Sequence, residues 1–305
     1  VGTDLDRLSI LGSISRYPAS AAVRLGVFNA PVPIGARFST INGTDSINFV
    51  VTAATGQDGQ YQLRAETTGD IGNTYAGPLL PITSIPGLTS AQLTELLIPG
   101  DDEETDEELR ARLIEALNER PFGGNMASYR SEILSMDGVG AIQVWPVWDG
   151  GGTVKCSLLG ADFLPASAEL VDMVQQAVDP LPNQGLGLGM APIGAQVKIA
   201  APEAVTVDVT GSVVLAAGYT IAQVQPVTEA AIAEYLLEVR KAWDKRLGNF
   251  TVTYAANVYL ARILALIVNT PGIVNAIGIS LNGAAADLML TESGQLQQVP
   301  VLGTV

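Results

Sequence analysis

The sequence predicts an α+β multidomain protein, in which a small β-rich N-terminal domain precedes two small α/β domains. Short β-favouring runs separated by Gly, Pro and Asn fill the first third, and helical and strand patterns alternate after residue 100. The length of 305 residues suits two or three compact units. We therefore expect a β-rich domain over residues 1–98, a central α/β domain over 99–200 and a C-terminal α/β domain over 201–305.

The β-rich domain is predicted from four runs of strand-forming residues, at 23–28, 36–41, 47–53 and 60–65. The segment 65–73, which follows them, contains Gly69 and Gly72. Glycine adopts positive φ at no steric cost, so both positions suit turns. A turn in any β domain would explain this segment equally well.

The central domain is expected to begin with an acidic helix, whose start signal lies within the stretch 100–113. Thr105 and Glu108 have the spacing of a capping box, in which the hydroxyl and the carboxylate each bind an otherwise unpaired backbone N–H. The acidic residues crowd the positive end of the helix dipole, and Arg110 and Arg112 lie toward its negative end. Leu109 and Leu113 give this helix an apolar face.

Further helices are predicted over 126–136 and 167–178, and strands over 141–147 and 154–159. Asp179-Pro180 stops the second of these helices. The glycine-rich stretch 183–194 lacks the Gly-Lys-Ser/Thr of a phosphate loop and follows a helix rather than a strand. We therefore expect a flexible crossover between domains.

The C-terminal domain is predicted to contain a strand at 205–210, helices at 228–241 and 255–268, and a strand at 273–281. Tyr129, Ile133 and Gly138 precede the strand at 141–147, and Tyr259, Ile263 and Gly272 precede the strand at 273–281. This correspondence is either a duplicated α/β unit or a common way of joining a helix to a strand. We favour duplication.

Composition argues against most enzyme classes. The chain has no histidine, which removes the usual general base and the commonest zinc ligand. Its single cysteine, Cys156, lies in an apolar segment and is expected to be buried and inert. The acidic cluster 101–108 is the densest set of carboxylates, and a solvated helix start explains it better than a metal or catalytic site. We expect no catalytic, cofactor or metal site.

Charge and hydropathy indicate protein partners. A net charge of −15 disfavours binding to a phosphate backbone, so we expect no nucleic acid partner. Charged residues make up only 15% of the chain and the mean hydropathy is +0.30, so part of the apolar surface is expected to meet other subunits. The most apolar run, 258–268, is interrupted by Arg262 and is too short to span a membrane. The chain begins at Val1 without a methionine or a signal peptide, and we expect a further N-terminal segment.

Several motifs resemble, in order, those of the baseplate J-like proteins of contractile phage tails and related injection systems. The acidic helix with its Arg-x-Arg and the turn after it carry most of the resemblance. The full set is Leu5-Asp6, Ser15-Arg16-Tyr17-Pro18-Ala19, 65–73, 107–112, Gly123-Gly124-Asn125, Gly138-Val139, Ala191-Pro192-Ile193-Gly194 and Val299-Pro300-Val301-Leu302-Gly303.

This resemblance implies a non-catalytic wedge protein of the baseplate, which forms a ring around the central hub and transmits the rearrangement that releases the sheath. The implied partners are a second copy, a smaller wedge subunit, neighbouring wedges in a six-fold ring, the sheath initiator and the hub or spike, without a membrane. The implied location is the tail of the virion, assembled in the host bacterial cytoplasm. The helical segment that the family carries before Leu5 is missing from the sequence.

The resemblance, together with the apolar run 259–268, suggests that the C-terminal segment carries the ring contact. Trp145 and Trp148 continue a predicted strand and are expected in the core or at a subunit contact. The candidate interface residues are Tyr259, Ile263, Leu264, Leu266, Trp145 and Trp148.

Two other functions remain open. A tail-associated glycan hydrolase would need a pair of carboxylates in a groove, and one Asp or Glu substitution would abolish its turnover. A receptor-binding tail protein would form trimers with affinity for bacterial surfaces. Its usual β-rich tip contrasts with the helix and strand units that occupy more than half of this chain.

Overall fold

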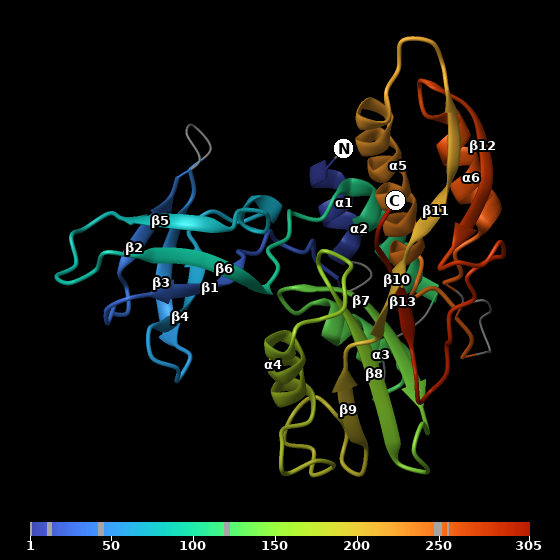
Figure 1. Ribbon diagram of the computed structural model, residues 1–305. Coiled ribbons are helices and arrows are strands. Elements are labelled where there is room, and N and C mark those ends of the chain that lie inside the picture. Colours follow the sequence, from blue (N-terminus) through green and yellow to red (C-terminus); the bar gives the residue numbers. More distant parts are fainter. Residues whose placement is uncertain (1, 11–13, 42–45, 119–122, 247–251, 255) are drawn as a thin grey trace. The chain divides into compact units, whose positions relative to one another are not determined.

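A computed structural model describes the whole chain except residues 1, 11–13, 42–45, 119–122, 247–251 and 255 (Figure 1). The fold is mixed α/β and divides into two compact units. The first comprises Val1–Gly140, Gly160–Asp162 and Ser167–Ala195, and the second comprises Ala141–Leu159, Phe163–Ala166 and Gln196–Val305. Within the described residues, every helix is too short or too polar to cross a membrane.

The first unit contains a closed six-stranded barrel with the strand order β1-β4-β3-β2-β5-β6. β1 closes it by pairing antiparallel with both β4 and β6. Alternate side chains point inward, and Phe38, Phe49 and Leu63 are fully buried in its core. The strands are β1 Val23–Phe28, β2 Arg37–Thr40, β3 Asn48–Ala54, β4 Gln60–Ala65, β5 Gly77–Pro81 and β6 Ala91–Ile98.

The four predicted strands are confirmed, whereas β5 and β6 were not predicted. Gly69 has the expected positive φ of 103°. Gly72 has a different role, because a Cβ there would lie only 2.8 Å from the Cβ of Ala22. It allows close approach of the backbone instead of a turn with positive φ.

Four helices belong to the first unit: α1 Gly2–Ser9, α2 Asp106–Asn118, α3 Met126–Leu134 and α4 Ala168–Val178. The three predicted helices are present, and α1 was not predicted. Asn125 caps α3 by accepting a hydrogen bond from the N–H of Ser128 at 2.8 Å. Ser167 caps α4 in the same way through the N–H of Leu170, at 3.2 Å. Residues 121 and 122, part of the motif after the acidic helix, lie outside the described residues.

The glycine-rich stretch 183–194 links α4 to the second unit and folds back on the end of that helix. The N–H groups of Met190 and Ala191 donate to the carbonyls of Ala177 and Val178, at 3.2 and 2.9 Å. Gly189 is required there, because a Cβ would lie 2.5 Å from the Val178 oxygen. Pro192 packs against Gly124, whose φ is +77°, so two of the sequence motifs meet.

Among the described residues, the second unit contains three small sheets and the helices α5 and α6. The strand β7 crosses the boundary between the units, which lies after Gly140. One sheet has the order β7-β8-β9, with β8 and β9 parallel. β10 and β13 form a parallel pair, and β11 and β12 an antiparallel pair. The bounds are β7 Val139–Pro146, β8 Thr153–Gly160, β9 Gln196–Ala200, β10 Glu203–Val207, β11 Val209–Leu215, β12 Ile273–Leu281, β13 Gln298–Leu302, α5 Ile221–Lys241 and α6 Leu260–Asn269.

The two predicted C-terminal helices have different starts in the structure. α5 begins at Ile221 rather than residue 228, after a capping box formed by Thr220 and Gln223, and continues through Pro226. α6 begins at Leu260, because Val258 instead exchanges backbone hydrogen bonds of 3.0 and 2.9 Å with Leu288. Ala255, the predicted start of α6, lies outside the described residues.

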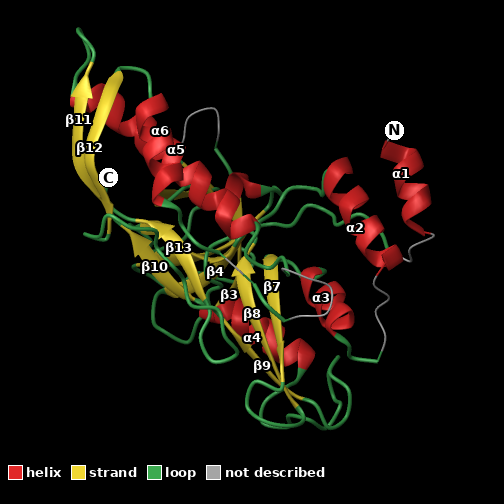
Figure 2. Cartoon of the chain, turned by 90° about the vertical axis from the view of Figure 1, so that its right-hand side faces the viewer, coloured by secondary structure: helices red, strands yellow, loops and turns green. Residues whose placement is uncertain are grey.

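The layers of the second unit are visible in Figure 2, where α5 and α6 lie along the β11–β12 ribbon. Their contact is an apolar core that includes Val207, Ile232, Leu236, Ile263 and Ile267, all of them buried. This core explains why the apolar positions of α5 and α6 recur at helical spacing.

The possible internal repeat has the same local geometry in both copies. Gly138 before β7 and Gly272 before β12 have φ values of 84° and 95°, as a tight turn from helix to strand requires. The two tyrosines differ in burial: Tyr129 is 5% exposed, whereas Tyr259 is 48% exposed. Duplication stays a prediction.

Candidate functional site

The predicted start of the acidic helix is confirmed. The N–H of Thr105 donates to Glu108 Oε2 at 2.8 Å, and the N–H of Glu108 donates to Thr105 Oγ1 at 3.3 Å. Leu109 is fully buried, as the apolar face predicted. The capping box fixes where α2 begins and therefore where its acidic and basic side chains point.

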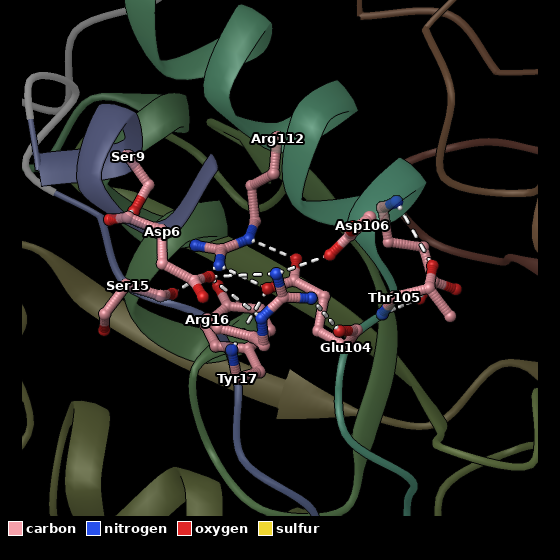
Figure 3. Close-up of polar contacts among 10 residues, drawn as sticks. Asp6, Ser9, Ser15, Arg16, Tyr17, Glu104, Thr105, Asp106 and Arg112 are labelled. Atoms are coloured by element: carbon pink, nitrogen blue, oxygen red, sulfur yellow. Dashed lines mark hydrogen bonds and ion pairs between the residues drawn. The ribbon is translucent and has the colours of Figure 1, made fainter. Parts of the chain in front are cut away.

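Arg16 joins three separate parts of the first unit around this helix start (Figure 3). Its Nη2 lies 2.9 Å from Asp6 Oδ1 and 2.7 Å from Asp106 Oδ1, and its Nη1 donates to the Glu104 carbonyl at 2.5 Å. The hydrogen bond to Asp106 is the main cause of the raised pKa of Arg16. One guanidinium thus ties α1 and the segment before the barrel to α2.

Arg112 makes a second set of contacts beside the first. Its Nε and Nη2 donate to the two carboxylate oxygens of Glu104, each at 2.7 Å, which is the bidentate geometry. Nη2 also donates to the Ser15 carbonyl at 2.5 Å, and the guanidinium lies 3.7 Å from the ring centroid of Tyr17. The N–H of Tyr17 donates to Glu104 at 3.0 Å. We call Asp6, Arg16, Tyr17, Glu104, Asp106 and Arg112 the polar joint.

The end of the barrel is bound to the same segment. Asn73 donates to the Gly100 carbonyl and accepts from the Gly100 N–H, both at 2.8 Å. Ser20 and Asp101 exchange two further hydrogen bonds, at 2.8 and 3.0 Å. The motifs 65–73 and 100–112, which are far apart in the sequence, therefore support the same joint.

Arg24 was missed by sequence reasoning because it lies inside a strand pattern with no charged neighbour in the sequence. Its side chain is buried and donates to the carbonyls of Glu95, Gly72, Asn73 and Thr94, at 3.1, 3.2, 2.6 and 2.5 Å. Burial lowers its pKa. Arg24 thus links β1, β6 and the turn 65–73 through backbone groups.

Glu292, in the second unit, was also missed. Both of its carboxylate oxygens are buried, and no described donor is in hydrogen-bonding geometry with either. Burial raises the pKa of Glu292 to about 7, and the nearby side chains of Gln143 and Trp243 oppose part of the rise. Gln143 donates instead to the Trp243 carbonyl at 2.8 Å and accepts from Trp145 at 3.1 Å.

The structure separates the predicted interface residues into exposed and buried positions. Tyr259 and Leu264, on or beside α6, are 48% and 38% exposed, and Leu266 is half-buried. Ile263 is fully buried in the core. The interface role of the whole set stays a prediction. Its exposed members could contact another subunit directly.

The two predicted tryptophans have different surroundings. Trp145 is 8% exposed and packs on Tyr254, with ring centroids 5.3 Å apart. Trp148 is half-buried, and the amines of Lys198 and Lys155 lie 5.1 and 5.7 Å from its ring centroid. Cys156 is buried, as expected, and burial raises its pKa.

Comparison with known proteins accounts for this combination of a barrel and two α/β regions. Three family descriptions match the chain: the baseplate J-like protein barrel domain over residues 20–99, the baseplate J-like central domain over 121–201 and the baseplate J-like protein C-terminal domain over 207–305. The chain belongs to the baseplate J-like family. In this baseplate J-like protein, the polar joint connects residues that precede the barrel domain to the start of α2, which lies between the barrel and central domains.

Curated relatives agree with the family. The chain is 33% identical to uncharacterized protein YqbT of Bacillus subtilis and 32% identical to the phage-like element PBSX protein XkdT of the same organism, each over 100% of this chain and 80% of the relative. It is 28% identical to baseplate protein gp47 of Escherichia phage Mu, over 58% of this chain and 51% of gp47. This baseplate J-like protein is therefore a structural component of a phage-type tail baseplate, among other baseplate proteins.

Proposed function

We propose that this chain is a wedge protein of a contractile tail baseplate, which forms part of the ring around the central hub and transmits the rearrangement that triggers sheath contraction. The observation that carries the proposal is membership of the baseplate J-like family along nearly the whole chain. Its immediate partners are a second copy and a smaller wedge subunit. The C-terminal domain links neighbouring wedges, and the sheath initiator and hub lie beyond them.

The polar joint supports a mechanical role. A segment that transmits movement must be held by contacts that keep their geometry under load, and bidentate ion pairs fix orientation as well as distance. Arg16 and Arg112 bind α1, the segment 15–17 and the start of α2 together through charged and backbone partners. Movement of the N-terminal segment is thereby coupled to α2 and to the end of the barrel.

The assembly is tested by co-expressing the protein with the products of the neighbouring tail genes. Size exclusion with mass determination and electron microscopy then report the complexes formed. We expect a stable heteromeric wedge or a six-fold ring. A lone monomer at high concentration would contradict the wedge assignment and favour the hydrolase hypothesis.

The transmission step needs its own test, since a ring can assemble without triggering. Tails carrying Arg16→Gln are expected to assemble and to lose control of contraction, either firing early or failing to fire, because Asp6 and Asp106 lose their shared cation. Arg7→Gln is the matched control, because the Arg7 side chain is 81% exposed. Wild-type contraction kinetics in both variants would contradict a role for the joint.

A further inference from the structure

One edge of β11 has little backbone pairing. β11 and β12 form a two-stranded sheet, so β12 occupies only one edge of β11. On the other edge, the N–H of Val209 donates to the Thr304 carbonyl at 2.8 Å. Beyond Val209, none of the described residues pairs with this edge through backbone hydrogen bonds. This edge of β11 is therefore paired at Val209 and open over residues 210–215.

An apolar groove lies beside the open edge. It has a volume of about 200 Å³ and is formed by β11, β12, the first two turns of α5, Ile267 of α6 and Val305. Gly211 and Val213 contribute from β11, and Ile221 and Val224 from α5. No charged side chain lines it, although the chain as a whole carries a net charge of −15. Figure 1 shows β11 running alongside α5, with the C-terminal end beside them.

The edge also lacks the charged residues and proline that protect many free strands, while its pairing with β12 has two irregular register steps. Exposed edges usually carry charges or proline, which discourage pairing with another chain. β11 has the sequence Val-Thr-Gly-Ser-Val-Val-Leu, without either. Val214 is 45% exposed and Ile221 is 53% exposed. Such an edge is a ready template for pairing with another chain.

We propose that β11 accepts a third strand, supplied by an extended, uncharged segment of a different baseplate protein with aliphatic side chains at alternate positions. Its backbone hydrogen-bonds to the open edge, and every second side chain enters the groove. This inference rests on the proposed function, in which the protein assembles in a baseplate. It specifies which strand makes one of the contacts and what kind of segment binds there.

The geometry favours this occupant over others. A lipid or a small apolar ligand would fill the groove but would leave the N–H and C=O groups of the edge without partners. The β11 strand of a second copy would bring Thr210, Gly211 and Ser212, which offer no aliphatic side chains to the groove. An extended segment satisfies both the backbone and the groove.

Site-specific photo-crosslinking in assembled baseplates tests the contact. A benzophenone amino acid replaces Ser212 or Val214, two exposed positions on β11, or Val227 of α5 as the control. We expect both β11 positions to cross-link to one segment of a different protein, at sites two residues apart, and Val227 to give no such product. Cross-links only to the same chain, to a second copy or to no protein at all would overturn the proposal.

A matched pair of substitutions tests the groove. Ile221→Glu introduces a carboxylate into the groove at the first residue of α5, where the helix dipole tolerates an acidic side chain. Val227→Glu makes the same change at a residue of equal exposure outside the groove. We expect Ile221→Glu to reduce recovery of the cross-linked partner at least tenfold with an unchanged melting curve, and Val227→Glu to reduce neither.

The outcomes separate the two proposals. Failure of the wild-type proteins to form any wedge or ring contradicts the proposed function. Normal rings with full partner recovery in Ile221→Glu contradict strand addition alone.

Discussion

Arg110 and Arg112 lie two residues apart on the acidic helix, yet their ion pairs differ in burial. The Arg112 and Glu104 side chains are 18% and 7% exposed, whereas those of Arg110 and Glu107 are 41% and 82% exposed. Exposed pairs are screened by water and contribute little, while removing one partner of a buried pair leaves a charge without compensation. The two arginines are equivalent in the sequence motif Arg-x-Arg, but the burial of their ion pairs predicts different contributions to stability.

We expect Arg112→Ala to lower the free energy of unfolding by about 2–4 kcal/mol, because the Glu104 carboxylate loses its cation and two hydrogen bonds, and the Ser15 carbonyl loses a donor. Urea unfolding followed by circular dichroism measures the change. Arg110→Ala is the control and should cost at most about 1 kcal/mol. Equal losses in the two variants would show that the joint has no special contribution.

Glu292 is a residue whose environment makes stability depend on pH. Its folded pKa of about 7 lies above the ordinary value of 4.5, so the folded state binds more protons than the unfolded state between these values. Stability is therefore highest below the unfolded pKa and falls as the pH rises toward 7.

We expect Glu292→Gln to match the wild type near pH 4 and to exceed its free energy of unfolding above pH 7, by up to about 3 kcal/mol. The comparison is made by denaturant unfolding at several pH values. Glu234→Gln, at an exposed position of α5, controls for the loss of one carboxylate. A pH-independent effect of Glu292→Gln would refute this account.

At the scale of the elements, Pro226 explains why the sequence analysis missed the first two turns of α5. Proline lacks an N–H and disfavours the helical conformation of the residue before it, so the predicted helix began after Pro226. In the structure, the capping box of Thr220 and Gln223 starts the helix at Ile221, and Pro226 lies within it on the exposed side. Packing of Val224 and Thr228 in the interior outweighs the local cost.

Replacing this proline should therefore stabilise the protein. We expect Pro226→Ala to raise the free energy of unfolding by about 1–2 kcal/mol, because the missing backbone hydrogen bond can form and no buried contact is lost. Pro226→Gly restores the same N–H with more backbone freedom and should gain less. Thermal unfolding ranks the three proteins, and a lower melting temperature for Pro226→Ala would contradict the prediction.

At the scale of the whole molecule, the proposed ring contact is assigned to the C-terminal segment, which includes α6. The predicted interface on α6 retains two exposed aliphatic or aromatic members, Tyr259 and Leu264, whereas Ile263 faces the core. An exposed apolar side chain on an amphipathic helix is a common interface contact. The ring contact of this face is still a proposal.

We expect Leu264→Glu to weaken ring assembly at least tenfold without changing the melting temperature, because the carboxylate would be buried in the contact between wedges. Arg262→Gln, at an exposed position two residues earlier, changes the net charge by the same single unit and is the control. Electron microscopy counts rings against free wedges. Full ring formation by Leu264→Glu would place the contact on another face.

The sequence by itself determined the local features of this protein. The strands at 23–28 and 60–65 have the bounds that their runs of strand-forming residues predicted, and the capping box of α2 forms between the two residues that predicted it. These features depend on neighbours within a few residues, which the sequence displays directly. The order of the motifs also carried the resemblance to the family that the comparisons confirm.

Only the tertiary structure decided which distant groups meet. Closure of the barrel, the four carbonyls around Arg24 and the meeting of Arg16 with Asp106 join residues 48 to 90 positions apart. The burial that raises the pKa of Glu292 and the open edge of β11 likewise depend on how whole elements pack. Side-chain periodicity specifies which face of an element is apolar, but the partner of that face is selected by the packing of the complete chain.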